Sequence, residues 1–512
     1  MELKWLLILL FVVPLFTLLI KTKAKSQLPL PPGPRAIPIL GNLVWLRQST
    51  SNIHSIVRDL HKRYGPIVTL RFGSRLSIYI SDRHLAHSAL ITHGAAFASR
   101  PKQTTIHEII NVNYHTISTA TYGSLWRILR RNLAGEFLQP SRVKLLSSAR
   151  KWTADLLKEE LSKSGNSNDK PFIETFHLAM FSLLVYMCFG KRLDKGHVNA
   201  IKSTQLDAML YFARKLGIFA FMPMLTKYLC QNRWNKALSL CNMQKELYKP
   251  LIESRRVLKT KRGEDEKKTN ADKFLKYCYV DTLLDIRLPD EGGRLLSDDE
   301  LVALCGEFFT AGTDTTSTAL QWIMAELVKN QEVQSKLWHE IQLVLANSNS
   351  EEINEEMLEK MPYLKAVVME ALRRHPPAHF LLDHAVTHEC TLGGYTIPQH
   401  AWVKFSAADI GMNEEIWKNP TEFKPERFLE GGEGEGVDIT GTKEIKMMPF
   451  GAGRRICPGL GIALLHLEYI VANMVKEFEW RGIEGQEVDL AEKLEFTVVM
   501  KKPLRAQLIP RK

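Results

Sequence analysis

Residues 450–459 read Phe-Gly-Ala-Gly-Arg-Arg-Ile-Cys-Pro-Gly and stand directly before an apolar stretch, 460–475, that has the composition of a buried helix. A cysteine just before a helix faces free backbone N–H groups and the positive end of the helix dipole, and both stabilise a thiolate. The glycines let the backbone turn tightly and approach a flat ligand. Arg455 supplies a fixed positive charge suited to a carboxylate. The segment therefore predicts that Cys457 is held as a thiolate beside a site for an anionic, flat group.

A second segment carries chemistry in the middle of a long predicted helix. Ser297, with Glu300 three residues later, forms a capping box, so a helix begins there. Residues 311–316 read Ala-Gly-Thr-Asp-Thr-Thr, and each glycine or threonine weakens a helix by roughly 0.5–1 kcal/mol relative to alanine. Threonine hydroxyls can bond backwards to carbonyls and open a groove. A helix so poor in helix formers at its centre indicates that these residues were kept for a function. From residues 311–316 alone, an acidic, threonine-rich surface turn is the alternative interpretation.

Both segments resemble the cytochrome P-450 superfamily, whose haem-binding signature is F-x-x-G-x-R-x-C-x-G. The matching residues are Phe450, Gly453, Arg455, Cys457 and Gly459. Residues 311–316 match the family's A/G-G-x-D/E-T-T motif, and the resemblance extends over essentially the whole chain. The proline-rich segment near the N-terminus and the wording around Cys457 look like the plant microsomal branch.

The resemblance implies a mainly α fold with a small β region, in which haem b lies between the long central helix and the helix behind the cysteine loop. Cys457 is then the axial ligand of the iron, and such ligation pushes electron density toward O–O cleavage. Thr315 and Asp314 are implied as the residues of oxygen activation and proton delivery. The other implied haem contacts are Phe450, Gly453, Arg455, Ala311 and Gly312, the last two because they leave space at the haem face.

Further family motifs concern the haem edge and the core. Trp126 and Arg130 match W-x-x-x-R, which implies contact with a haem propionate. His384 is implied as another propionate contact, but Asp383 stands before it where plant relatives commonly carry proline, and Met412-Asn413 stands where Arg-Asp is frequent. The family also implies that an E-x-x-R pair meets a later arginine in core assembly. These residues are Glu370, Arg373 and Arg427.

Residue periodicity predicts a large, mainly helical body. Alternating residues at 68–72 and 76–80 around Gly73-Ser74-Arg75 predict a β-hairpin, and 391–405 has strand character. The charged stretch 255–273 predicts a mobile surface connection, and the glycine-rich 431–436 predicts a flexible insert that does not pack. The predicted helices are roughly 122–137, 142–162, 173–189, 204–217, 232–258, 297–329, 331–346 and 362–374.

Composition limits the partners and the compartment. The 512 residues carry a net charge of +12, which favours an acidic partner: nucleic acid, an anionic membrane surface or an acidic protein. The sequence contains no nucleic-acid-binding module and no basic stripe interleaved with aromatics, so we expect no nucleic-acid partner. Seven cysteines, an odd number without C-x-x-C spacing, are typical of a reducing compartment.

The N-terminus predicts a membrane anchor. From Trp5 to Ile20 the residues are apolar except Pro14 and Thr17, a helix of about 24 Å against a ~30 Å hydrocarbon core. A cleaved signal peptide is the alternative, but the lysines at 21–25 are a poor cleavage site and favour a cytosolic body. We therefore expect an endoplasmic reticulum protein with an anchor and basic flank over 1–25, a stiff proline-rich hinge over 26–42 and one haem-thiolate catalytic domain over 43–512.

The predicted function is an NADPH-dependent monooxygenase that receives electrons from a membrane-bound flavoprotein reductase and acts on a lipophilic small molecule. One alternative is a haem-thiolate isomerase or dehydratase, which often lacks the Asp-Thr pair; another is a membrane-tethered haem sensor. A basic docking face for the reductase is predicted from Arg127, Arg131, Lys443, Lys446 and Arg454. The substrate pocket is expected to draw on 105–118, 206–225, Phe308, Phe309, 378–382 and 496–499.

Overall fold

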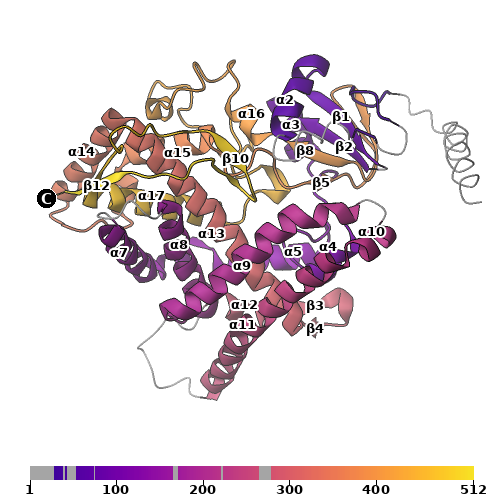
Figure 1. The fold of residues 1–512 in the computed structure, drawn as a ribbon, viewed down its shortest axis with the longest axis horizontal. Coiled ribbons are helices and arrows are strands. Elements are labelled where there is room, and N and C mark those ends of the chain that lie inside the picture. Colours follow the sequence, from indigo (N-terminus) through magenta and orange to yellow (C-terminus); the bar gives the residue numbers. More distant parts are fainter. Residues whose placement is uncertain are drawn as a thin grey trace, which may run out of the picture.

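The structure, a computed structural model, describes residues 28–37, 41–42, 53–73, 75–164, 171–220, 223–264 and 278–511. Within these ranges the chain forms a large helical body with small β-sheets, as the family resemblance implied (Figure 1). The predicted anchor lies outside the described residues, as do residues 26, 27 and 38–40 of the predicted hinge, so both stay predictions.

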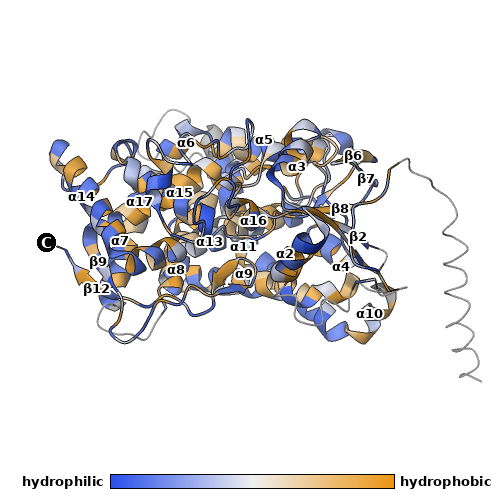
Figure 2. Ribbon diagram, turned by 90° about the horizontal axis from the view of Figure 1, so that it is seen from above, coloured by the Kyte–Doolittle hydropathy of each residue, from blue (hydrophilic) through white to orange (hydrophobic). Residues whose placement is uncertain are grey.

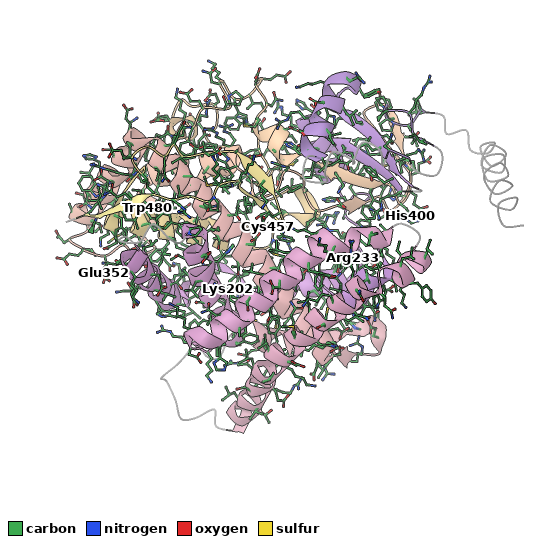
Figure 3. The ribbon with its side chains drawn as sticks, viewed as in Figure 1. Lys202, Arg233, Glu352, His400, Cys457 and Trp480 are labelled. Atoms are coloured by element: carbon green, nitrogen blue, oxygen red, sulfur yellow. The ribbon has the colours of Figure 1, made fainter. Side chains whose placement is uncertain are left out.

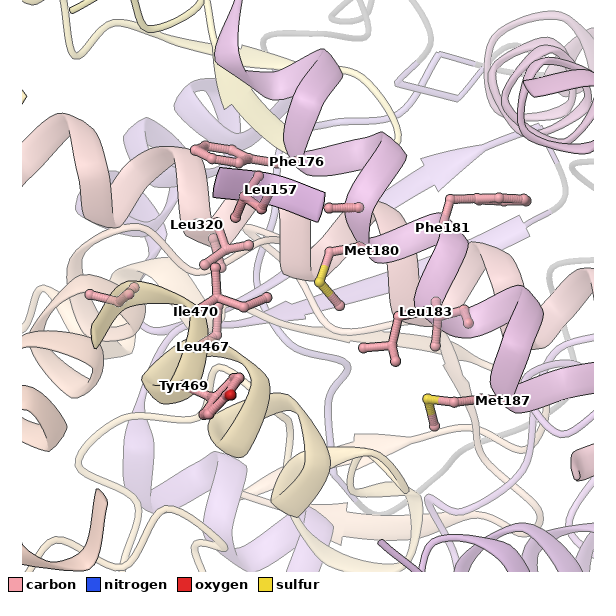
Figure 4. Packing of buried hydrophobic residues seen from close by; sticks show 14 of the residues in the cluster. Leu157, Phe176, Met180, Phe181, Leu183, Met187, Leu320, Leu467, Tyr469 and Ile470 are labelled. Carbon is pink, nitrogen blue, oxygen red and sulfur yellow. The ribbon is translucent and has the colours of Figure 1, made fainter. Parts of the chain in front are cut away.

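Helix α13 (Asp298–Lys329) is the central element of the body. Its first turn has the predicted capping box, in which Ser297 and Glu300 bond each other's backbone N–H. Every residue from Thr316 to Val328 is buried, including the polar Gln321 and Glu326, so this half of the helix is surrounded by the core on all sides. It packs against α8 (Phe172–Phe189) and α17 (Leu460–Glu477), whose side chains interlock in one cluster (Figure 4).

Helix α8 is the one helix among the described residues that is long and apolar enough to cross a membrane, and it is largely buried in this core. Around it the predicted helices are confirmed with shifted ends. The first of them is divided into α5 (Ser124–Arg131) and a π-helical stretch over Asn132–Phe137. The remaining predicted helices correspond to α6 (Pro140–Lys144) with α7 (Ser147–Ser164), α9 (Lys195–Lys215), α11 (Gln231–Glu264), α14 (Gln331–Asn347) and α15 (Pro362–Arg374). The described helices that the sequence did not predict are α2 (Ile53–Tyr64), α3 (Arg83–His87), α4 (Thr105–Ile110), α10 (Pro223–Leu229), α12 (Tyr279–Leu283) and α16 (Ala407–Gly411).

The predicted hairpin is confirmed as β1 (Ile67–Phe72) and β2 (Arg75–Ile80), which pair antiparallel. Two strands from the second half of the chain complete this sheet in the order β1-β2-β8-β5, where β8 (Trp402–Phe405) lies parallel to β2. The remaining described strands form two-stranded sheets. They are β3 (Arg287–Leu288), β4 (Arg294–Leu295), β6 (Cys390–Leu392), β7 (Tyr395–Ile397), β9 (Phe478–Arg481), β10 (Glu492–Leu494), β11 (Val498–Met500) and β12 (Gln507–Pro510), whereas β5 (His384–Ala385) is the edge strand of the four-stranded sheet.

The predicted core triad is confirmed. Arg373 donates from Nε and Nη2 to the two carboxylate oxygens of Glu370, at 2.6 and 2.8 Å, and Arg427 Nε donates to Glu370 at 3.2 Å. Arg373 also bonds the carbonyls of Gly411 and Pro420. All three charged groups are buried, so the network fixes the segment that follows α15 against the loop before the cysteine.

Two predictions about loops were wrong. The stretch 255–273 was expected to be a surface loop, but α11 continues to Glu264, because lysine, arginine and glutamate are good helix formers even without an apolar face. Residues 265–273 of this stretch lie outside the described residues. The glycine-rich insert 431–436 packs tightly: a Cβ at Gly432 would lie 2.2 Å from the Arg427 carbonyl oxygen, and Gly434 is buried against Phe428. These glycines allow close approach to the triad instead of flexibility.

Candidate functional site

The loop before α17 holds Cys457 near the middle of the molecule (Figure 3). The Cys457 backbone N–H donates to the Phe450 carbonyl at 2.9 Å, which closes the loop on itself. Gly453 has φ +69°, and a Cβ there would lie 2.1 Å from the Leu90 carbonyl oxygen. A side chain at this position would therefore push the loop away from the segment it packs on.

The thiol of Cys457 lies in a strongly desolvated position. Burial raises the pKa of the Cys457 thiol, while the Gly459 N–H and the Arg130 guanidinium act in the opposite direction. Cys457 nevertheless keeps some accessible surface, and so do its neighbours from Gly453 to Leu460. A cation bound to Sγ would shift the balance toward the thiolate, as thiolate ligands of metals require.

One face of α13 is accessible although the helix is central. Ala303, Glu307, Ala311 and Thr315 follow each other at intervals of four, so they share a face, and each keeps accessible surface, Ala311 most of all. The Thr315 hydroxyl donates to the Ala311 carbonyl at 2.6 Å, the backward bond expected from the sequence. We call these four residues the α13 stripe.

Gly312 does not have the role predicted for it, which was to leave space at the haem face. A Cβ at Gly312 would lie 2.8 Å from a methyl carbon of Leu184 on α8. The glycine therefore lets α8 and α13 pack closely, whereas Ala311 is the small residue on the accessible face. Asp314 also turns away from the stripe and is buried, with its carboxylate bonded by the Thr497 hydroxyl at 2.7 Å.

Three arginines gather between the cysteine loop and the stripe. Arg455 donates to the carbonyls of Ala98, Ile117 and Ala120. Burial, followed by the like charges of Arg100 and Arg130, lowers the pKa of Arg455 to about 9. We call Arg100, Arg130 and Arg455 the arginine cluster.

The other members of the arginine cluster are desolvated as well. Burial lowers the pKa of Arg100 to about 10 and also lowers the pKa of Arg130. The indole Nε1 of Trp126 is buried without a hydrogen-bond partner among the described residues, and the Arg455 guanidinium lies 4.6 Å from its ring centre. Buried cations and an unused N–H donor suit carboxylate groups.

The comparisons with known proteins now bear directly on this site. The Cytochrome P450 family model matches residues 31–510. The chain belongs to the cytochrome P450 family. It is 45% identical over 496 residues to Cytochrome P450 89A9 of Arabidopsis thaliana, with 94% of each chain covered. It is 30% identical to Flavonoid 3'-monooxygenase CYP75B137 of Crocosmia x crocosmiiflora, covering 96% of this chain and 95% of that one.

The fold agrees with solved structures of the family. A zebra fish cytochrome P450 determined with progesterone superimposes with a TM-score of 0.73 at 22% identity, covering 90% of this chain and 99% of the other. The chain is thus a haem-thiolate monooxygenase of a plant branch, with haem b as its cofactor, and electron supply from NADPH through a reductase is the usual arrangement in the family. The desolvated thiol, the arginine cluster and the Trp126 donor fit a haem and its two carboxylates.

His384 is buried beside the arginine cluster of this P450. Its Nδ1 bonds the Phe97 carbonyl at 2.7 Å, so Nδ1 carries the proton. Burial, followed by Arg100, lowers the pKa of His384 to about 3, which leaves Nε2 as an acceptor in the neutral ring. A bond from His384 to a haem carboxylate stays a prediction. The unusual Asp383 before it forms an ion pair with Lys404.

Several residues predicted for the substrate pocket belong to the core or to ion pairs. Phe309 is fully buried between Phe181 and Tyr248. His115 pairs with Glu300, and His379 pairs with Glu492 at 2.8 Å. Phe221 and Met222 lie outside the described residues. Exposed apolar side chains on the described parts of the predicted segments are Ile109, Leu225, Leu382 and Phe496.

Sequence reasoning missed Arg100 and Glu307. The two Glu307 oxygens accept the backbone N–H groups of Ile117 and Ser118 at 2.8 and 2.6 Å. Arg100 donates to the carbonyl of Ser118 and to those of Leu382 and Asp383. One loop therefore joins the α13 stripe to the arginine cluster. In the sequence, Glu307 could have been identified by its spacing of four residues from Ala311, which places both on one face of the helix. No sequence pattern pointed to Arg100.

We expect Glu307→Ala to weaken haem retention. The substitution leaves two backbone N–H groups without acceptors and frees the loop that orients Arg100 and Arg455, at a cost of about 1–3 kcal/mol for each unsatisfied donor that stays buried. The rate of haem transfer to an excess of apomyoglobin measures the effect. Glu332→Ala, at an exposed position of α14, is the matched control. Equal transfer rates for the two variants would contradict the linkage.

Proposed function

We propose that this chain is an anchored monooxygenase of the endoplasmic reticulum, with a cytosolic catalytic domain over 43–512. It inserts one oxygen atom from O2 into a lipophilic small metabolite, with electrons from NADPH through a flavoprotein reductase. Cys457 is the axial ligand. The observation that carries this proposal is the position of the Cys457 thiol: it is desolvated and accessible, at the start of α17, with Arg130 beside it.

In this proposal the arginine cluster and Trp126 bind the haem carboxylates. Phe450 closes the cysteine loop through its carbonyl, and Gly453 seats the loop on Leu90. Gly312 acts indirectly, by letting α8 approach α13. His384 supports the arginine cluster from the side of Phe97.

When bound, the haem supplies the binding and reductive activation of dioxygen. The side chains around the haem provide space, hydrogen bonds and protons for that chemistry. The α13 stripe leaves room at Ala311, and the Thr315 hydroxyl, at present donating to the Ala311 carbonyl, orients oxygen or water there. Asp314, although its carboxylate is turned away from the stripe and bonded by Thr497, takes part in supplying protons to this site.

The substrate class and the membrane location are supported by accessible apolar residues. On α10, Leu225, Tyr228 and Leu229 are 51%, 78% and 74% exposed, and clustered apolar exposure marks a membrane or partner surface. The Leu28 carbonyl accepts a bond from Thr396 of β7, and β7 lies at the same end of the molecule as α10 (Figure 2). This end is where the described chain leads back toward the predicted anchor.

The proposed reaction is tested by following labelled dioxygen into the product. The full chain, with reductase in lipid vesicles, is supplied with NADPH, labelled dioxygen and a lipophilic substrate chosen by the spectral shift it causes. One labelled atom in the product and NADPH-dependent oxygen consumption are the expected results. Two results together would favour the isomerase instead. The protein would convert a hydroperoxide without NADPH, and none of the substrates that cause a spectral shift would yield labelled product.

Reductase docking is proposed at the exposed arginines of α5 and the cysteine loop. Arg127 and Arg454 both lie over the ring of Tyr122, and Arg454 donates to its hydroxyl at 2.7 Å, so one basic surface joins α5 to the cysteine loop. Arg131 is exposed beside it, whereas Lys446 is occupied by Glu433 and Glu444.

We expect Arg127→Glu with Arg131→Glu to raise the Kd for the reductase by about tenfold or more at low salt, because complementary charge steers such encounters. Titration of the reductase into the vesicle-bound protein measures the Kd. Arg233→Glu with Lys236→Glu makes the same change of charge on exposed positions of α11 and should leave the Kd near the wild-type value. An unchanged Kd for the first pair removes this docking surface.

A further inference from the structure

Among the described residues, two polar side chains contact the carboxylate of Asp314, and they differ in their access to solvent. Thr497 donates to Oδ2 at 2.7 Å and also bonds the Thr318 hydroxyl at 3.0 Å. His177 approaches from α8, with Nε2 3.4 Å from Oδ1. Asp314 and Thr497 are 6% and 2% exposed, whereas the His177 side chain is 16% exposed.

His177 contacts the buried Asp314 carboxylate and is also partly accessible to solvent. Its Nε2 is buried and has no hydrogen-bond partner among the described residues, although it lies within ion-pair reach of Asp314. The accessible part of the side chain is therefore elsewhere on the residue. Glu174, one turn earlier on α8, is exposed, and residues three apart on a helix lie on the same side. His177 thus stands between a solvent-facing side of α8 and the buried carboxylate.

A buried carboxylate that delivers protons must be reprotonated after each delivery. Thr497 leads only to Thr318, which is itself fully buried. Of the two polar side chains that reach the Asp314 carboxylate, His177 is the more accessible to solvent, and an imidazole ring can accept a proton at one nitrogen while it releases a proton from the other. An alternative role is purely structural, in which His177 fills the space between α8 and α13.

We propose that His177 is the proton relay that resupplies Asp314 from solvent. The inference rests on the role proposed above for Asp314 in proton delivery. His177 acts through Asp314 and is a positioning residue for the proton. The imidazole, in its Nε2–H form, takes a proton at Nδ1 from a solvent hydronium ion and releases the Nε2 proton to Asp314 Oδ1. An O–H bond of the hydronium ion and the Nε2–H bond break, the Nδ1–H bond and an O–H bond on Asp314 form, and no electrons are transferred. The ring is left neutral as the Nδ1–H tautomer, and proton exchange with water restores the Nε2–H form.

The test uses the full chain with reductase and a coupled substrate, and it compares His177→Gln with Asp314→Asn and Thr497→Val. The measured quantities are product formed per NADPH, peroxide released, and the solvent deuterium isotope effect on turnover. Glutamine keeps much of the size and polarity of histidine but does not relay protons. We expect His177→Gln to lower product per NADPH about tenfold, near the lower end of acid–base effects, to raise peroxide release, and to increase the isotope effect.

The controls separate proton supply from packing. Thr497→Val removes the hydrogen bond that Thr497 donates to Asp314, so it disturbs the carboxylate without touching the relay and should keep the wild-type isotope effect. Substrate dissociation constants from spectral shifts should stay unchanged in His177→Gln. A second readout is thermal unfolding: the Tm loss of the double variant His177→Gln/Asp314→Asn should be smaller than the sum of the two single losses.

The outcomes distinguish the relay from the role of Asp314. If Asp314→Asn loses coupling and His177→Gln retains wild-type coupling and isotope effect, the relay is overturned and the role of Asp314 stands. If Asp314→Asn itself behaves as wild type, the proposed role of Asp314 fails and the relay falls with it. His177→Asn replaces His177→Gln if the latter does not yield folded protein, with the same expected results.

Discussion

Cys457→Ser is expected to reduce oxygen insertion to background while leaving the fold intact. Serine is nearly isosteric, so the packing of the loop on Leu90 is kept, and the bond to the Phe450 carbonyl comes from the backbone N–H of residue 457. The change in free energy of unfolding should stay within about 1.5 kcal/mol. A serine hydroxyl does not ionise near neutral pH, so the electron donation that thiolate ligation provides is lost.

Product formation under NADPH and reductase measures the loss of activity, and circular dichroism with thermal unfolding verifies the fold. Cys390→Ser is the matched control, because Cys390 is also a free, partly buried thiol but lies on β6, far along the chain from the cysteine loop. It should keep wild-type turnover. Oxygen insertion by Cys457→Ser at more than a small fraction of the wild-type rate would mean that a different residue binds the iron.

Arg373→Ala is expected to prevent accumulation of folded, haem-containing protein. The substitution leaves Glu370 partly unpaired in a buried position, and the carbonyls of Gly411 and Pro420 lose their donor. Breaking a buried charge pair by removing one partner costs about 3–5 kcal/mol, a large share of the total stability of a protein. The yield of soluble protein, its haem content and its urea unfolding midpoint measure the effect.

A comparable pair on the surface provides the control. Arg256 contacts Glu253 at the same spacing of three residues and also bonds Asp298, but all three of these side chains are at least one-third exposed. Arg256→Ala should therefore cost about 1 kcal/mol or less. If Arg373→Ala gave the same yield and midpoint as Arg256→Ala, the triad would not be holding the core together.

The elements that carry chemistry were predictable because their signals are local. The capping box at Ser297 and Glu300 set the start of α13, and alternation around Gly73 set the β1–β2 hairpin. The sequence next to Cys457 predicted a loop followed by a helix. Each of these features depends on residues within a few positions of one another.

Long-range features escaped prediction for physical reasons. Arg100 and Glu307 act on backbone carbonyls and N–H groups of one loop, and backbone groups leave no trace in a sequence pattern. The role of Gly312 depended on which side of α13 faces Leu184. His177 belongs to no motif, and its meaning comes only from its approach to Asp314 across the contact of α8 with α13.

The most direct test of Cys457 as the ligand of the haem iron is the absorption difference spectrum of the reduced protein with carbon monoxide, recorded for the full chain and for Cys457→Ser. We expect a thiolate-type spectrum for the wild type and for Cys390→Ser. In Cys457→Ser we expect that spectrum to be lost while the haem is still bound. A Cys457→Ser protein that keeps the thiolate-type spectrum would contradict the assignment of Cys457 as the ligand of the haem iron.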